Sequence, residues 1–240
     1  MRSAKLLTTC LVVVIFILQA CPIGWSAEVT AKARVKHIGV AAKSEPHSNE
    51  GVVMWLTPLD SIPFSARTAG STHSHAQLAQ KNKQFVPHLL VVQTGSVVDF
   101  PNLDPFFHNV FSLFNGKRFD LGLYESGSSR SVRFDRSGVS YIFCNIHPEM
   151  SAVVVTVPTP YYAMSSPAGS LVIHDVAPGN YMMHVWAMGN SDASLASMGR
   201  RITVPAGGLD LGTVALEESG LGPHKNKFGE DYDLQKTTPY

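Results

Sequence analysis

Three side chains that can bind a metal ion occur within seven residues, in the segment CNIHPEM. They are Cys144, His147 and Met150, in the spacing C-x2-H-x2-M. A thiolate and a thioether combined with an imidazole suit copper better than calcium, magnesium or manganese. Structural zinc takes four strong ligands, and a thioether is not among the usual ones. The segment therefore predicts most of a copper site.

A second imidazole must come from elsewhere in the chain, because electron-transfer copper sites combine two His and one Cys with a weak axial Met. The best candidate is His108, in the sequence FPNLDPFFHNV, whose aromatic side chains are expected to exclude water. We predict that His108, Cys144, His147 and Met150 together bind one type 1 (blue) copper ion.

Two apolar runs, 139–143 and 152–157, flank the segment that carries Cys144. Both predict strands, because they are short, rich in β-branched and aromatic residues, and bounded by turn residues. The loop between them must be tight, and Pro148 restricts its backbone. No segment shows a helical period over three turns, so an all-β sandwich is predicted. Further runs of the same kind lie at 29–40, 51–56, 89–92, 96–100, 108–113, 130–134, 170–174, 181–186, 200–204 and 211–216.

The stretch from about Gln84 to Val157 resembles the cupredoxins, and its short loop with an upstream His-Asn-Val is similar to that of amicyanin-like proteins. The resemblance implies a Greek-key β-sandwich with the four predicted ligands around type 1 copper. It also implies that Asn109 ties the His-bearing segment to the Cys loop, whereas an ordinary turn Asn is the alternative. Redox proteins, a dehydrogenase donor or a cytochrome acceptor, are the partners that the resemblance implies.

The rest of the chain is arranged around this copper domain. The segments GVVMWL and GSLVIHDVAPGNY resemble the two halves of a carboxypeptidase-regulatory-like β-sandwich, into which the copper domain would be inserted. The whole chain then resembles bacterial exported proteins of the methylamine-utilisation type. The predicted parts are a signal peptide (1–26), the first part of the outer sandwich (27–58), a linker (59–83), the copper domain (84–158), the second part of the outer sandwich (159–216) and a surface-wrapped or frayed tail (217–240).

The N-terminal sequence predicts export to the periplasm or beyond. Two basic residues precede an apolar run at 6–20 that is short for a membrane span, and small residues follow it. Lipid attachment at Cys21 or an uncleaved anchor is an alternative, and either would keep the protein at a membrane. Of three cysteines, only Cys144 lies beyond the leader. A lone thiol in an oxidising compartment is expected to be occupied, here by a metal.

The favoured hypothesis is a carrier of single electrons and not an enzyme. Copper delivery without redox turnover would use the same ligands. A surface-binding β-sandwich in which copper is incidental is a further alternative. An enzyme with Cys144 and His147 as nucleophile and base lacks an apparent orienting acid. The formal charge of +1 gives no reason to expect nucleic acid. We expect His73 and His75 to be solvated, and Asn102 and Asp104, beside two prolines, to cap turns.

Overall fold

The computed structural model describes residues 26–38, 48–60, 75–113, 116–218 and 225–231. The predicted signal peptide with Cys21, and His73, lie outside these ranges, apart from Ser26. The elements are β1 (Ala27–His37), β2 (Val53–Pro58), β3 (Ala76–Gln77), β4 (Ala79–Lys81), β5 (Gln84–Val86), β6 (Leu89–Gln93), β7 (Val97–Pro101), β8 (His108–Ser112), β9 (Phe119–Tyr124), β10 (Ser129–Arg133), β11 (Gly138–Cys144), β12 (Ser151–Val157), β13 (Tyr162–Met164), β14 (Ser170–Val176), β15 (Gly179–Trp186), α1 (Asp192–Met198), β16 (Arg200–Val204) and β17 (Leu209–Glu218).

Within the described ranges, none of the helical structure has the length and apolar character needed to cross a membrane.

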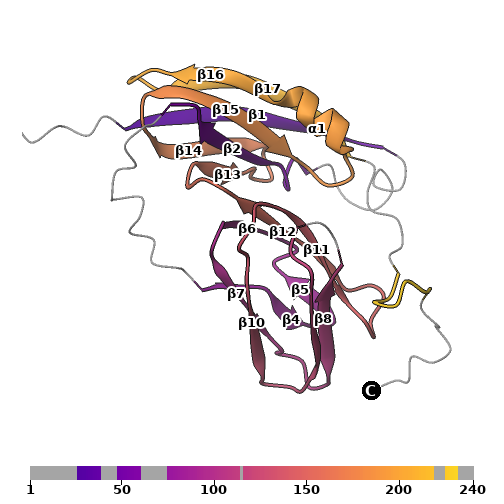
Figure 1. The fold of residues 1–240 in the computed structure, drawn as a ribbon. Helices are drawn as coiled ribbons and strands as arrows, with labels where there is room; N and C mark the ends of the chain where they lie inside the picture. The colour runs from indigo at the N-terminus through magenta and orange to yellow at the C-terminus, as the bar shows by residue number, and fades with distance from the viewer. Residues whose placement is uncertain (1–25, 39–47, 61–74, 114–115, 219–224, 232–240) are drawn as a thin grey trace, which may run out of the picture.

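The strands form two units (Figure 1). The middle unit, residues 76–157, contains the sheets β6-β12-β11-β8-β9 and β10-β7-β3 and the pair β4-β5. The outer unit, residues 27–58 and 162–218, contains the sheets β14-β1-β17 and β13-β2-β15-β16. Each outer sheet thus combines strands from before and after the middle unit. The predicted all-β class, with one sandwich inserted into another, is confirmed, whereas the carboxypeptidase-regulatory-like character of the outer unit stays a prediction.

Strand β12 contributes side chains to the cores of both units. Successive side chains of a strand point to opposite faces of its sheet. Val153, Val155 and Val157 pack into the core of the outer unit. Ala152 and Val154 pack into the core of the middle unit, together with Cys144 and Met150. Burial on both faces explains why the sequence of β12 is continuously apolar and does not alternate.

The predicted linker at 59–83 is shorter in the structure, because β3 and β4 lie within it. These two strands pair with β7 and β5 of the middle unit. Leu78 between them is fully buried, and so is Gln80, whose Oε1 accepts a hydrogen bond of 2.6 Å from the Tyr124 hydroxyl. Strands of two or three residues with one apolar side chain show too little pattern for detection from the sequence. Residues 61–74 lie outside the described part.

Candidate metal centre

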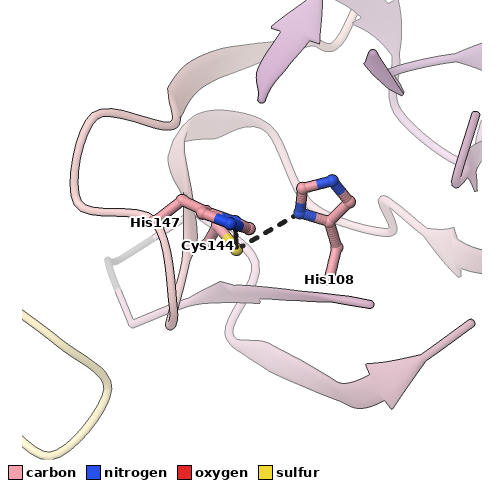
Figure 2. Close-up of side chains that lie close together, drawn as sticks. All are labelled: His108, Cys144 and His147. Atoms are coloured by element: carbon pink, nitrogen blue, oxygen red, sulfur yellow. Dashed lines mark hydrogen bonds between the residues drawn. The ribbon is translucent and has the colours of Figure 1, made fainter. Parts of the chain in front are cut away.

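Three of the predicted ligands meet inside the middle unit (Figure 2). His108 begins β8, Cys144 ends β11, and His147 lies in the loop that follows β11. Because β11 pairs with β8 so that Cys144 lies opposite Val110, His108 two residues away shares the same face of the sheet. One donor atom from each of the three residues lies within 4.8 Å of the others. Within the described ranges, no other His, Cys, Asp or Glu side chains form such a group.

The spacing of the donors fits one small metal ion. The Cys144 Sγ lies 3.7 Å from the His108 Nδ1 and 3.6 Å from the His147 Nδ1. Bonds of about 2.3 Å to thiolate sulfur and about 2.05 Å to imidazole nitrogen, at tetrahedral to trigonal angles, would separate sulfur and nitrogen by about 3.6 to 3.8 Å. The three donors are therefore already placed for coordination, and the donor set is typical of a type 1 copper site.

Met150 closes the ligand loop. The backbone N–H of Cys144 donates to the Met150 carbonyl at 3.2 Å, and the Met150 N–H donates to the His147 carbonyl at 3.1 Å. The Met150 side chain is fully buried in the same apolar cluster as Cys144. These two hydrogen bonds keep the loop tight, as the sequence predicts. The role of Met150 as the axial ligand stays a prediction.

The Cys144 thiol is fully buried, and its burial raises its pKa. Backbone hydrogen bonds from Ile146, Asn109 and His147 act in the opposite direction, because they stabilise the thiolate. The net result is a thiol that favours its protonated form in the absence of a cation. A bound metal ion supplies the positive charge that a thiolate needs at this position.

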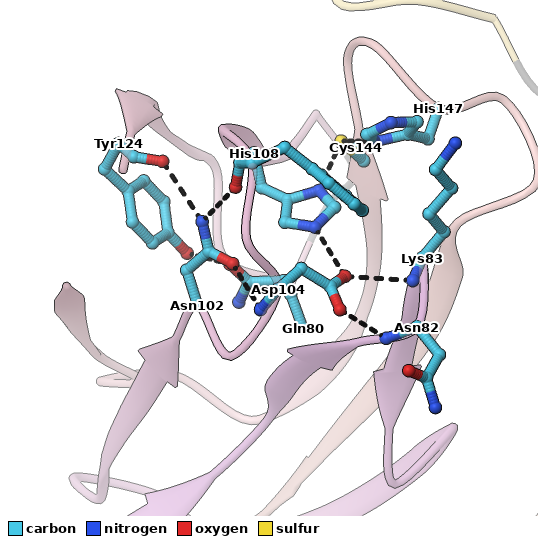
Figure 3. A network of polar contacts seen from close by, with 10 residues as sticks. Gln80, Asn82, Lys83, Asn102, Asp104, His108, Tyr124, Cys144 and His147 are labelled. Atoms are coloured by element: carbon cyan, nitrogen blue, oxygen red, sulfur yellow. Dashed lines mark hydrogen bonds and ion pairs between the residues drawn. The ribbon is translucent and has the colours of Figure 1, made fainter. Parts of the chain in front are cut away.

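The His108 ring is held by an acidic side chain on its far side (Figure 3). Its Nε2 lies 2.9 Å from the Asp104 Oδ2, while its Nδ1 faces Cys144. When Nε2 donates to this carboxylate, the lone pair of Nδ1 is left for a metal ion. Burial lowers the pKa of His108, although Asp104 acts in the opposite direction. The ring is therefore prepared to bind as the neutral imidazole.

Asp104 does more than the turn capping that we predicted for it. It accepts hydrogen bonds from the backbone N–H groups of Asn82 and Lys83, on a separate segment. Burial acts to raise the pKa of Asp104, but the bonds from Lys83, His108 and Asn82 outweigh it and the pKa is lowered. The carboxylate thus stays ionised and fixes His108. The four-residue spacing from Asp104 to His108 was the available signal, and it is weak outside a helix.

Asn102 stabilises the turn that leads to His108, as predicted. Its Oδ1 accepts from the Asp104 N–H at 3.0 Å. Its Nδ2 donates to the carbonyls of Phe106 at 2.8 Å and Tyr124 at 3.3 Å. A buried amide that satisfies three backbone groups fixes the path of the segment that carries Asp104 and His108.

Aromatic packing covers the two imidazoles. The Phe106 ring centroid lies 5.2 Å from that of His108 and 5.6 Å from that of His147. The His147 ring is partly exposed, whereas the His108 side chain is fully buried. The pKa of His147 is lowered, mainly because the ring is partly buried and to a smaller extent because His108 lies beside it. Of the two aromatic residues directly before His108, Phe106 thus covers the imidazoles as predicted, whereas Phe107 is exposed.

Asn109 links the site to β9. Its Nδ2 donates to the Asp120 Oδ1 at 2.7 Å, and its backbone forms a hydrogen bond to Cys144. The resemblance implied a tie between the His-bearing segment and the Cys loop. In the structure the backbone of Asn109 makes the hydrogen bond to Cys144, while its side chain bonds to Asp120 on β9. Outside the site, His75 is mostly exposed, and its Nδ1 lies 2.9 Å from the Asp99 Oδ2.

Comparison with known proteins finds partial structural similarity. No family model and no curated protein sequence matches the chain. A copper-containing nitrite reductase from Thermus scotoductus SA-01 is 20% identical over 35% of this chain and 22% of its own, with a TM-score of 0.33. A purple cupredoxin from Nitrosopumilus maritimus is 24% identical over 34% of this chain and 99% of its own, with a TM-score of 0.31. A reduced amicyanin variant is 20% identical over 42% of this chain and 98% of its own, with a TM-score of 0.34. This chain thus spans about a fifth of the length of the nitrite reductase.

Proposed function

We propose that this protein carries single electrons through one type 1 copper ion bound by His108, Cys144 and His147, with Met150 as axial ligand. The observation that carries the proposal is the placement of one thiol and two imidazole nitrogens at metal-binding distances in a largely buried site. When bound, copper supplies a one-electron couple whose potential depends on the axial ligand and on hydrogen bonding to the Cys sulfur.

The surroundings of the ligands favour redox turnover with little rearrangement. Asp104 fixes the His108 ring, and three backbone hydrogen bonds reach the Cys144 sulfur. The ligand loop is closed by the hydrogen bonds between Cys144 and Met150 and between Met150 and His147. Ligands held by several segments of the fold move little when the charge of the ion changes, which keeps electron exchange fast.

His147 is the proposed point of electron exit, because it is partly exposed while His108 is buried. The segment that carries Phe106 also exposes Leu103 and Phe107, at 58% and 55%. Exposed apolar side chains on the segment whose Phe106 packs against His147 suit the small, transient contacts of redox partners. A dehydrogenase donor or a cytochrome acceptor, and export to the periplasm, are parts of this proposal.

The decisive test is the copper-loaded protein in solution. We expect an intense thiolate-to-copper band in the visible region, together with a reversible one-electron potential. Binding of Cu(I) alone, with transfer to an acceptor and no reversible couple, would instead support copper delivery. A His147→Gly variant is expected to exchange electrons more slowly, and exchange at the wild-type rate would exclude His147 as the exit.

An enzymatic role for the Cys144 thiol is disfavoured by its surroundings. A nucleophilic Cys needs access and a lowered pKa. The Cys144 side chain is fully buried, and burial raises its pKa. Both properties suit a metal ligand that is deprotonated by the ion it binds.

A further inference from the structure

Residues 225–231 fold back onto the middle unit, although they follow β17 of the outer unit in the chain (Figure 1). This C-terminal turn is closed on itself by hydrogen bonds. The Asn226 N–H donates to the Glu230 carbonyl at 2.9 Å, and the Asn226 Oδ1 accepts from the N–H groups of Phe228 and Glu230. Gly229 has a φ of +82°, which L side chains rarely adopt. The turn is therefore a defined structure that can present one side chain in a fixed direction.

Lys227, inside this turn, contacts two different parts of the metal centre's surroundings. Its backbone N–H donates to the Asn145 Oδ1 at 3.0 Å, and Asn145 directly follows Cys144 in the ligand loop. Its Nζ donates to the Asp120 Oδ2 at 2.8 Å, on β9. One residue from outside both ligand-bearing segments thus bridges the Cys loop and β9.

Asp120 carries this contact on to the His108 segment. Its other oxygen, Oδ1, accepts from the Asn109 Nδ2 at 2.7 Å, and Asn109 directly follows His108. The backbone of Asn109 in turn bonds to Cys144. Asn145, Lys227, Asp120 and Asn109 therefore form a continuous chain of hydrogen bonds from the residue after Cys144 to the residue after His108.

We propose that Lys227 is a positioning residue for the copper site, fastening the Cys144–Met150 loop to β9 and to the His108 segment. The proposal deepens the proposed copper function and rests on it. An exposed ion pair usually contributes little to global stability. Loss of the Lys227–Asp120 pair is therefore expected to make the Cys144–Met150 loop open more often, with little change in the stability of the whole fold.

Lys227→Met in the full chain tests this, because it removes the ammonium and keeps a side chain of similar length. We expect copper release to a chelator to become up to about tenfold faster. This factor is the lower end of the loss in metal affinity seen when residues that orient metal ligands are substituted. Lys227→Arg should restore most of the wild-type rate. Asp120→Asn removes the other partner of the same pair, so the double variant should release copper no faster than the faster single variant.

Lys117→Met is the matched control. The Lys117 side chain is 25% exposed, as is that of Lys227, and it pairs with Asp135 at 3.0 Å. Among the described residues, the hydrogen bonds of Lys117 go to the Ser140 hydroxyl and the Asp135 carboxylate, neither of which is a ligand or lies in the ligand loop. It should leave copper release unchanged. Release at the wild-type rate from Lys227→Met, or equal acceleration by Lys117→Met, would overturn the proposal.

Amide hydrogen exchange in the metal-free protein gives a second readout that does not depend on copper. Lys227→Met should speed exchange at the loop amides of Ile146, His147 and Met150, whereas Lys117→Met should not. Unchanged exchange there would also contradict the positioning role. The absence of a reversible one-electron potential in the wild-type protein would contradict the proposed electron transfer. The role of Lys227 would still be decided by comparing amide hydrogen exchange in the ligand loop of the two lysine variants.

Discussion

The middle unit and the outer unit bury different kinds of side chain. Among the described residues, most buried polar groups lie in the middle unit: Gln80, Asn102, Asp104, His108, Asn109, Ser112, Ser140 and Thr156. Strands β1, β2 and β13–β17 of the outer unit bury apolar side chains alone. Four of these residues, Asn102, Asp104, His108 and Asn109, form or surround the metal centre, whereas the strands of the outer unit gain stability from apolar packing.

The units nevertheless share the sheet that carries the Cys ligand. The outer faces of β6, β11 and β12 contribute Leu89, Tyr141 and Val155 to the core of the outer unit. Their inner faces belong to the core that contains Cys144 and Met150. The outer unit therefore covers a surface of the middle unit that would otherwise be exposed and apolar. From this arrangement we expect site geometry and global stability to respond to different substitutions.

Cys144→Ser should give the largest effect, confined to the middle unit. We expect the intense visible band of the copper-loaded protein to disappear, because a hydroxyl cannot replace the thiolate as a ligand. The apoprotein should keep its fold, since a hydroxyl oxygen can still accept the backbone hydrogen bonds that reach the sulfur. Absorption and circular dichroism spectra measure the two expectations. A band of wild-type intensity would place the copper site elsewhere.

Leu171→Ala, in the outer unit, should lower stability and leave the metal centre unchanged. Leu171 on β14 is fully buried and pairs with Ala31 on β1. Its truncation should lower the free energy of unfolding by about 2 to 5 kcal/mol. Denaturant titration of the apoprotein measures this loss. The position of the copper band should stay at the wild-type value, and a shifted band would show that the two units are coupled more tightly than their cores indicate.

Val154→Ala and Val155→Ala separate the two faces of β12. Each removes two buried methyl groups and should lower stability by about 2 kcal/mol. Val154 packs in the core with Cys144, whereas Val155 packs in the core of the outer unit. A change in the reduction potential is therefore expected for Val154→Ala alone. Equal shifts in both variants, measured by voltammetry, would contradict the division of the cores.

The sequence predicts the three grouped donors well, because the ligand loop is local. Cys144 and His147 are three residues apart between two apolar strands, so their approach depends on one tight loop. His108 comes from a distant strand, but its chemistry and aromatic neighbours distinguish it from the scattered His residues. The all-β class likewise follows from short apolar runs between turn residues.

The parts that the sequence did not predict depend on contacts between distant polar residues. The Asp104 carboxylate contacts His108 and is held by the backbone N–H groups of Asn82 and Lys83, which lie 22 and 21 positions earlier in the chain. The contact of Lys227 with Asn145 joins residues that are 82 positions apart. Hydrogen bonds of this kind leave no periodic pattern in the sequence. Strands β3 and β4 were missed for a related reason, because their sequences contain few apolar residues. The fully buried side chains of this segment are Leu78, between the two strands, and the polar Gln80.

The smallest expected effect is a pH dependence that both units share. Burial is the first cause of the lowered pKa of His108 and His147 in the middle unit and of His184 in the outer unit. The unfolded chain takes up protons near pH 6.5, whereas these folded rings take them up only at lower pH. Their contribution to apoprotein stability is thus complete above about pH 6.5 and is lost as the pH falls through their lowered values.

Substitution at His184 divides this pH dependence between the units. His184 stacks on Trp55 with ring centroids 5.1 Å apart, so His184→Gln removes one titrating ring outside the metal centre. Apoprotein unfolding measured between about pH 7 and pH 5 should lose stability less steeply in His184→Gln than in the wild type. Copper binding should follow the same pH profile in both proteins, because protons compete with copper at His108 and His147. An unchanged unfolding slope would mean that His184 titrates normally, and the pH dependence would then belong to the middle unit.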